Sequence, residues 1–292
     1  MLAAGAALLA VLVLAAAVAF LTAPDVSPLR KSNPKETAMM RYRENQAKQN
    51  GLRSRRLQSW VPLSRISQNL IQAVLISEDD KFFMHAGFDW EGIRDALEKN
   101  LRYGHIVGGG STITQQLAKN LYLSPTRNPV RKIREAVLAF LLDKKLTKKR
   151  ILELYLNVIE WGRGVYGAEA AAQVYFRKPA LELSLPESVR LASILPSPIR
   201  FGPEGTSSPW MVRRRRSIAD RMLRRHFITQ GQYRLILADV DPESAVAFPD
   251  TAAVRMVLPA QADTTDTDGG RNPLPIFEPS RPDSPGLSSA VL

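Results

Sequence analysis

Glu78 stands in a sequence context that favours acid–base chemistry. It follows Ile71 by seven residues and Val74 by four, so it lies on the apolar face of a helix expected over 67–79. Apolar surroundings and a helix C-terminus both disfavour the charged carboxylate and adapt it to exchange a proton near neutral pH. A glutamate that simply ends a surface helix has the same spacing, so periodicity leaves both interpretations open.

A glycine-rich segment followed by a helix offers a site for an anion. Gly108–Gly110 precede Ser111, and Thr112 with Gln115 has the spacing of a capping box. The polar face of the expected helix carries Thr112, Gln116 and Lys119. A helix N-terminus with a lysine nearby suits a cluster of anionic oxygens. An ordinary capped amphipathic helix would show the same pattern.

The helix expected from Asn128 to about Lys145 begins with cations around a carboxylate. Asn128 and Pro129 are typical of the first two positions of a helix. The charged residues that follow are Arg131, Lys132, Arg134 and Glu135. They indicate either a phosphate-binding patch with a carboxylate held among the cations, or a surface ion-pair cluster of little energetic consequence.

Five motifs follow one another in a fixed order along the chain. They are EDDKFFMHAG at 78–87, GGSTITQQLAKN at 109–120, RKIRE at 131–135, KKRILELYLN at 148–157 and GVYGAEAAAQVYFRK at 164–178. Over roughly residues 63–235 the chain closely resembles the peptidoglycan glycosyltransferase family, in particular the monofunctional biosynthetic transglycosylases. The resemblance implies a mostly α-helical, lysozyme-like glycosyltransferase domain. It also implies an enzyme that polymerises lipid II into glycan strands and releases undecaprenyl pyrophosphate.

The same resemblance assigns roles to individual residues. Glu78 would be the general base and Glu135 the second essential carboxylate. The expected substrate-binding residues are Asp79, Phe82, His85, Ser111, Thr112, Gln115, Gln116, Lys119, Asn120, Arg131 and Lys132. No metal-ligating residues and no required cofactor are expected, although a divalent cation such as Mg or Mn is compatible with a pyrophosphate substrate. Sensitivity to moenomycin, which resembles a phosphorylated glycolipid donor, is expected as well.

Elementary chemistry agrees with that reaction. Attack of an acceptor GlcNAc 4-hydroxyl on C1 of a donor MurNAc needs one base, and inversion needs no covalent intermediate. Pyrophosphate leaves as a stable anion, which Lys119, Arg131 and Lys132 would stabilise. A lysozyme-like glycan-cleaving enzyme would instead show a lone catalytic glutamate and no basic patch. A non-catalytic cell-wall scaffold, the other alternative, would be expected to lack Glu78 or Glu135.

Composition excludes several classes of protein. Among 292 residues there are no cysteines and three histidines, which excludes a disulfide scaffold and a thiolate metal site. The formal charge of +12 indicates an anionic partner. No recognition motif for nucleic acid accompanies this charge, so nucleic acid is not an expected partner. The arginines at 213–216, 221, 224 and 225 are expected to form a solvated helix face, or to rest on anionic lipid headgroups.

The composition changes along the chain indicate four segments. Residues 1–23 contain no charged residue and predict one transmembrane anchor, with a cleaved signal peptide as the alternative. A basic juxtamembrane linker is expected at 24–62 and the glycosyltransferase domain at 63–238. The remaining residues, 239–292, are rich in Pro, Asp and Ser and are expected to form a disordered tail.

The expected location is the cytoplasmic membrane, with a single span and the catalytic domain on the outer, periplasmic side. The expected partners are lipid II, the growing glycan strand, the membrane, transpeptidases and other wall-synthesis proteins. Arg30, Lys31 and Lys35 follow the apolar segment, and the positive-inside rule alone would place the C-terminal body in the cytoplasm. The charge bias and the family resemblance therefore disagree about orientation.

Overall fold

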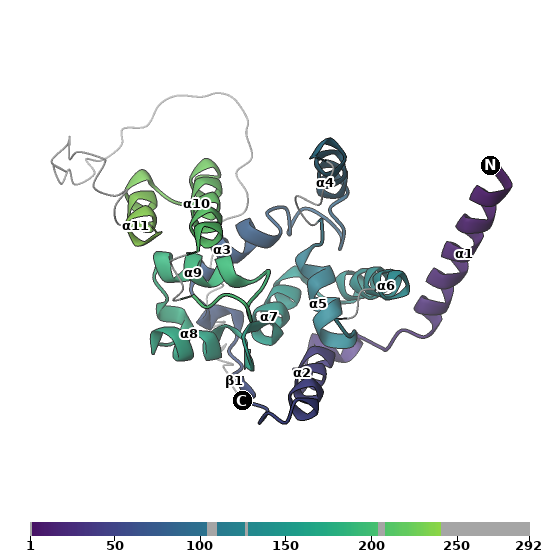
Figure 1. Cartoon of the computed structure of the whole chain (residues 1–292), viewed down its shortest axis with the longest axis horizontal. Coiled ribbons are helices and arrows are strands. Elements are labelled where there is room, and N and C mark those ends of the chain that lie inside the picture. Colours follow the sequence, from purple (N-terminus) through teal and green to yellow (C-terminus); the bar gives the residue numbers. More distant parts are fainter. Residues whose placement is uncertain (1, 104–109, 126–127, 204–207, 241–292) are drawn as a thin grey trace, which may run out of the picture. The chain divides into compact units, whose positions relative to one another are not determined.

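The chain is mostly helical, as predicted (Figure 1). The computed structural model describes residues 2–103, 110–125, 128–203 and 208–240. Gly108 and Gly109 of the glycine-rich segment lie outside these residues, and so does the predicted tail from residue 241 onward. The helices are α1 (Leu2–Leu21), α2 (Ala38–Gln49), α3 (Gln68–Glu78), α4 (Trp90–Tyr103), α5 (Ile113–Tyr122), α6 (Pro129–Lys145), α7 (Lys148–Val158), α8 (Ala168–Phe176), α9 (Leu185–Ile194), α10 (Pro209–Arg224) and α11 (Gln230–Val240).

Local capping residues set where several helices begin. Thr112 and Gln115 form the predicted capping box at the start of α5. The side chain of Asn128 accepts a hydrogen bond from the Val130 amide, with Pro129 as the first residue of α6. The predictions that concern these two helix starts are confirmed, and Thr147 caps α7 in a similar way, accepting from the Arg150 amide.

One continuous hydrophobic core joins α3 and the helices from α5 to α11. Within it α5 packs against both α6 and α7, α3 packs against α9, and α10 packs against α3, α9 and α11. The alanine-rich α8 buries Ala168 and Ala170–Ala172, and these small side chains let the neighbouring backbone approach closely. The core therefore fixes the ends of α3, α5 and α10 relative to one another.

A small sheet ties the N-terminal part of the chain to the middle of the domain. Strand β3 (Val165–Tyr166) pairs in parallel with β1 (Leu57–Gln58) and antiparallel with β2 (Glu160–Gly162). Gly164 beside this sheet has φ +72°, and a Cβ there would lie 2.1 Å from the Arg55 carbonyl oxygen. Only glycine fits this approach of the two backbones.

The segment 24–62, predicted as a linker, packs closely against the helical domain. It contains a short 3₁₀ helix, η1 (Ser27–Arg30), as well as α2 and β1. Its apolar side chains are buried at Val26, Leu29, Met39 and Met40. Composition alone does not predict these contacts, because the few apolar residues are spaced along an otherwise polar and basic sequence.

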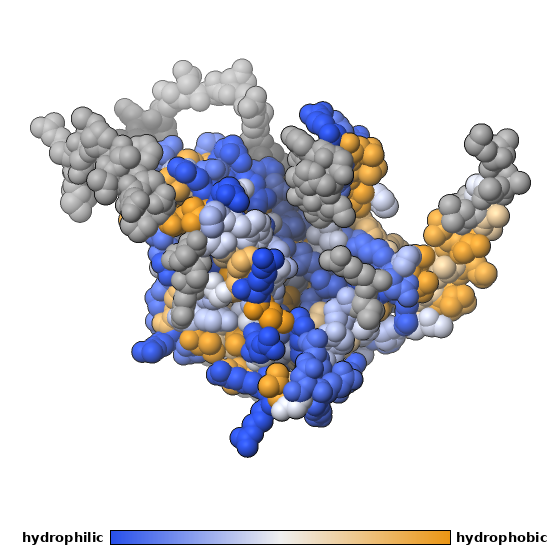
Figure 2. All heavy atoms as spheres, viewed as in Figure 1, coloured by the Kyte–Doolittle hydropathy of each residue, from blue (hydrophilic) through white to orange (hydrophobic). Residues whose placement is uncertain are grey.

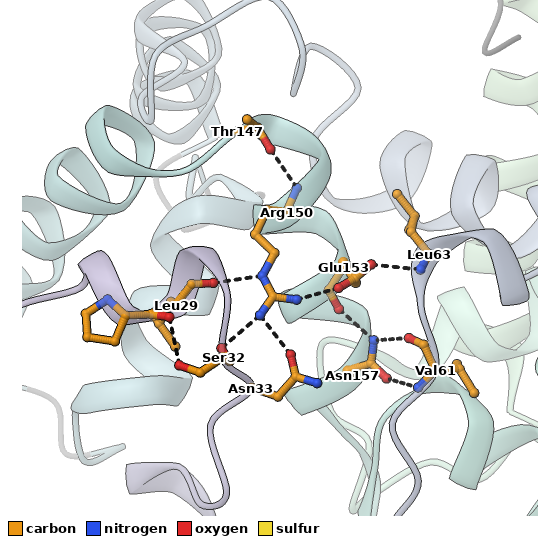
Figure 3. Close-up of polar contacts among 10 residues, drawn as sticks. Leu29, Ser32, Asn33, Val61, Leu63, Thr147, Arg150, Glu153 and Asn157 are labelled. Atoms are coloured by element: carbon orange, nitrogen blue, oxygen red, sulfur yellow. Dashed lines mark hydrogen bonds and ion pairs between the residues drawn. The ribbon is translucent and has the colours of Figure 1, made fainter. Parts of the chain in front are cut away.

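Arg150 on α7 provides the main polar attachment of this segment (Figure 3). Its guanidinium donates to the carbonyl oxygens of Leu29 and Ser32, each at 2.8 Å, and to Oδ1 of Asn33 at 2.7 Å. It also forms an ion pair with Glu153. One arginine thus satisfies backbone acceptors within η1 and just after it.

The same face of α7 holds the chain just before α3 (Figure 3). Oε2 of Glu153 accepts from the Leu63 amide at 2.9 Å, beside the short helix η2 (Leu63–Arg65). Asn157 accepts from the Val61 amide at 3.0 Å and donates to the Val61 carbonyl at 2.9 Å. Two stretches of chain that flank β1 are therefore attached to one helix.

The predicted transmembrane segment is not confirmed. Within the part of the chain that the structure describes, no helix is both long and apolar enough to cross a membrane.

We expect Arg150→Met to lower the free energy of unfolding by about 2–3 kcal/mol, because several charged hydrogen bonds are lost while the aliphatic stem is kept. Chemical denaturation of the full chain measures this change. Arg65→Met is the matched control, since Arg65 is exposed and should change stability by no more than about 0.5 kcal/mol. Equal stability of the two variants would contradict the role of Arg150.

Candidate active site

Asp79 joins the end of α3 to the start of α5. Its Oδ2 accepts from the Ile113 amide, the first residue of α5, at 2.9 Å. Its Oδ1 lies 2.9 Å from Nε2 of His85. A buried carboxylate at a helix N-terminus is stabilised by the unsatisfied amides and by the helix dipole. Asp79 and His85 therefore hold these two helix ends together.

The amides at the start of α5 already have protein partners. The Thr112 amide donates to Gln115 Oε1 at 2.9 Å, and the Gln115 amide donates to Thr112 Oγ1 at 3.2 Å. The hydroxyl of Thr112 donates to the Gly87 carbonyl at 2.7 Å. With the Ile113 amide bound to Asp79, the helix N-terminus leaves few donors for a ligand. An anion site here must therefore depend on side chains, which differs from the expectation of a free helix N-terminus.

Both carboxylate oxygens of Glu78 are contacted: besides a long hydrogen bond from the Ser77 hydroxyl to Oε1 at 3.4 Å, each oxygen receives one contact from a residue distant in the sequence. Nε2 of Gln116 donates to Oε2 at 3.0 Å, and Nη2 of Arg214 lies 2.8 Å from Oε1. The Glu78 side chain is 11 % exposed, so it is not the surface residue that periodicity also allowed. Both contacts stabilise the carboxylate anion. Local sequence pattern does not indicate that either partner lies beside Glu78.

Tyr155 fixes the orientation of Gln116 from the other side. Its hydroxyl donates to Gln116 Oε1 at 3.0 Å. Burial, helped by the nearby charge of Glu78, raises the pKa of Tyr155 well above its usual value, so the phenol stays a donor at neutral pH. A chain of hydrogen bonds thus runs from α7 through α5 to the end of α3.

Glu135 lies buried among cations in the first turns of α6. It is 3 % exposed and pairs with Arg131 at 2.6 Å and with Lys132. Nζ of Lys132 also donates to Ser111 Oγ at 3.0 Å, which brings the glycine-rich segment to α6. The burial of Glu135 excludes a purely solvated ion-pair cluster, because exposed pairs leave both partners in water.

Lys119 on α5 lies close to the same cluster. Burial lowers its pKa, the carboxylate of Glu135 opposes this effect, and the cations of Arg131 and Lys132 add to it. Glu78 also acts to raise its pKa, so Lys119 senses both carboxylates. Among the described residues its ammonium group has no hydrogen-bond or ion-pair partner. A half-buried cation of this kind is ready to accept an anionic ligand.

Phe82 and Asn120 lie within the protein scaffold. Phe82 is fully buried, with the ammonium of Lys148 4.7 Å from the centre of its ring. The amide of Asn120 donates to the Gln116 carbonyl at 2.8 Å on its own helix. These two predicted substrate-binding residues thus contact protein groups in this structure.

A cavity of about 180 Å³ opens in front of Glu78. It lies between the end of α3, the start of α4, residues 110–112 and α10, and Figure 2 shows hydrophilic side chains (blue) around the hollow between α10 and α4. Glu78, Asp80, Ser111, Thr112 and Arg221 are among the residues that line it. The cavity places polar groups of four separate elements around one space.

The prediction of a solvated arginine face is wrong for part of α10. Arg215 is fully buried, Arg214 pairs with Glu78, and Arg221 lines the cavity with its pKa lowered by burial. Arg215 lies four residues after Met211 and three before Ile218, both of which are buried. That helical spacing was the available signal, but four consecutive arginines concealed it.

Metal-ligating clusters were not expected, and the described residues contain no group of three or more His, Asp or Glu side chains arranged to hold a metal ion.

Residues 44–223 match the family model described as Transglycosylase. The chain belongs to the transglycosylase family. It is 47% identical over 193 residues to the biosynthetic peptidoglycan transglycosylase of Chromobacterium violaceum, which covers 66% of this chain and 84% of that protein. It is 49% identical over 193 residues to the protein of the same name from Aromatoleum aromaticum, with 65% and 82% covered.

The transglycosylase match confirms the family predicted from the five motifs, and it begins within α2, before the predicted domain start at residue 63. Penicillin-binding protein 1A from Haemophilus influenzae is similar over 63% of this chain and 18% of that chain, at 25% sequence identity and a TM-score of 0.37.

We expect the amine of Lys119 to titrate below the usual range of lysine, because burial disfavours its charged form. NMR of protein labelled at lysine Cε measures this, and Lys119→Arg identifies the signal. Glu135→Gln should lower the pKa of Lys119 further, since it removes the carboxylate that opposes the effect of burial on that pKa. A Lys119 signal that titrates in the ordinary range and ignores Glu135→Gln would contradict this account.

Proposed function

We propose that this transglycosylase polymerises lipid II in cell-wall synthesis. It would join lipid II units into β-1,4-linked glycan strands with inversion at MurNAc C1, releasing undecaprenyl pyrophosphate. The observation that carries the proposal is the presence of two differently built carboxylates. Glu78 faces a cavity, and Glu135 is buried among the cations Arg131 and Lys132.

Glu78 is proposed as the general base for the attacking 4-hydroxyl of the acceptor sugar. Its contacts with Gln116, Arg214 and Ser77 occupy part of the carboxylate, and Oε2, which accepts only from Gln116, has a further lone pair to receive a proton. Displacement with inversion requires one such base and no covalent intermediate on the enzyme.

The cations around Glu135 are proposed to stabilise the leaving pyrophosphate. Lys119, Arg131 and Lys132 come together from α5 and α6, and Ser111 adds a hydroxyl beside them. Because pyrophosphate leaves as an anion, cations replace the acid that a glycan-cleaving enzyme would need. Glu135 would hold these cations in position, which distinguishes the site from that of a lysozyme-like hydrolase.

The remaining predicted site residues are proposed to act mainly by positioning these groups. Asp79 and His85 join α3 to α5, Thr112 and Gln115 form the cap of α5, and Gln116 orients Glu78. The proposed chemistry needs no cofactor, and a divalent cation would enter with the pyrophosphate of the substrate.

The enzyme is further proposed to work at the outer face of the cytoplasmic membrane, held there by its N-terminal segment. Residues 1–23 carry no charge, and α1 exposes large apolar side chains such as Leu14, Phe20 and Leu21 (Figure 2). A substrate with a polyprenyl tail must also be reached at a lipid surface. Transpeptidases and other wall-synthesis proteins are proposed as partners because glycan strands must be crosslinked.

We expect Glu78→Gln to reduce polymerisation of labelled lipid II by about 100-fold or more, because the near-isosteric amide lacks the proton acceptor. Moenomycin should still bind, which reports an intact donor region. Glu182→Gln, at an exposed glutamate on η3 (Ala180–Glu182), is the matched control and should polymerise at the wild-type rate. Near-normal polymerisation by Glu78→Gln would remove Glu78 from the mechanism, and an inactive wild type would refute the proposed function.

We expect the body of the chain to lie outside the cytoplasm. Alkaline phosphatase fused after Leu292 should then be active, and protease added to spheroplasts should digest the body while an N-terminal fragment stays with the membrane. The same fusion on a chain that lacks residues 1–23 is the control and should be inactive. A body protected until lysis would show that the charge bias after the apolar segment sets the orientation.

A further inference from the structure

Arg214 reaches the candidate base from a distant part of the chain. It lies on α10, which packs against α3, and its Nη2 is 2.8 Å from Oε1 of Glu78 at the end of that helix. The two side chains are 21 % and 11 % exposed, so the pair is largely removed from water. A pair in such a setting interacts more strongly than a solvated one.

Two further contacts hold the guanidinium of Arg214 in place. Its Nε donates to the Ser193 carbonyl, in the last turn of α9, at 3.0 Å. Its Cζ lies 5.8 Å from the centre of the Trp210 ring, and Trp210 stacks on Phe201 with ring centres 4.8 Å apart. A planar guanidinium held by a carbonyl and an aromatic ring has few orientations left.

We infer that Arg214 is a positioning residue for Glu78, and that Ser193 and Trp210 set the orientation in which it meets the carboxylate. This inference rests on the proposed function, in which Glu78 is the general base. A base must be ionised before the acceptor hydroxyl arrives, and a fixed cation at one oxygen maintains that state. With Gln116 on the other oxygen, the plane of the carboxylate is fixed as well.

Other charged groups near Glu78 limit how much one substitution changes. Lys119 on α5 and Arg221 on α10 are cations that interact with Glu78, and Tyr155 on α7 stays protonated. Asp79 and Asp80 follow Glu78 directly and are nearby carboxylates along the cavity. Because the two cations remain, Glu78 keeps positively charged neighbours when Arg214 is replaced.

The test is the pH dependence of kcat/KM for labelled lipid II, measured on the full chain. The acidic limb of this profile reports protonation of the essential base in the free enzyme. For Arg214→Gln we expect this limb to move to higher pH by about one unit or more, because removal of a nearby cation favours the protonated carboxyl. Arg214→Lys keeps the charge and should restore the limb with a lower kcat, since its ammonium lacks the planar fork.

Two more variants separate positioning from a general loss of structure. Trp210→Leu keeps Arg214 and removes the ring, so the limb should move in the same direction by a smaller amount, and kcat should fall. Arg213→Gln alters the exposed neighbour of Arg214 and should give the wild-type profile.

An Arg214→Gln enzyme with an unshifted acidic limb would overturn the inference, whether its kcat is normal or uniformly reduced. If Arg214→Gln does not fold, Trp210→Leu decides, and an unshifted limb there overturns it. A wild type that does not polymerise lipid II would refute the proposed function instead.

Discussion

The carboxylate of Asp79 joins the two helix ends on which the candidate site depends. It accepts the Ile113 amide at the start of α5 and contacts His85, while the preceding residue, Glu78, faces the cavity. Without this acceptor, a buried amide of α5 would lose its partner and the end of α3 would lose its connection to α5. This connection between α3 and α5 determines the position of Glu78 relative to Gln116.

The contact between Asp79 and the start of α5 also determines which groups are left to bind an anion. Because Asp79 and the capping box occupy amides at the start of α5, the helix N-terminus contributes little to a ligand. The charge of a pyrophosphate would have to be balanced by side chains, and Lys119 and Lys132 are placed for this. Burying Glu135 among cations adds little net stability, since desolvation offsets attraction in such pairs. Its effect is to hold the cations at a defined place.

What the sequence predicted correctly depends on short-range physics. The capping box of Thr112 and Gln115 and the cap by Asn128 involve residues a few positions apart, so spacing alone indicates them. The pair between Glu78 and Arg214 spans 136 positions, and nothing in the local pattern indicates that Arg214 reaches Glu78. The family motifs predicted site residues on α3, α5 and α6, but α10 lay outside those motifs.

The packing of the segment 24–62 likewise could not be predicted from local sequence pattern, and it gives α7 a second role. Composition described residues 24–62 as basic and polar, yet Arg150 attaches Leu29 and Ser32 to α7 through backbone carbonyls, which carry no sequence signal. On another face of that helix, Tyr155 contacts Gln116 and through it Glu78. One helix therefore joins the segment 24–62 to the candidate base. If residues 1–23 are held at a lipid surface, the attachment of the following segment to α7 fixes the distance and direction of the base from that surface. A flexible linker could not do this.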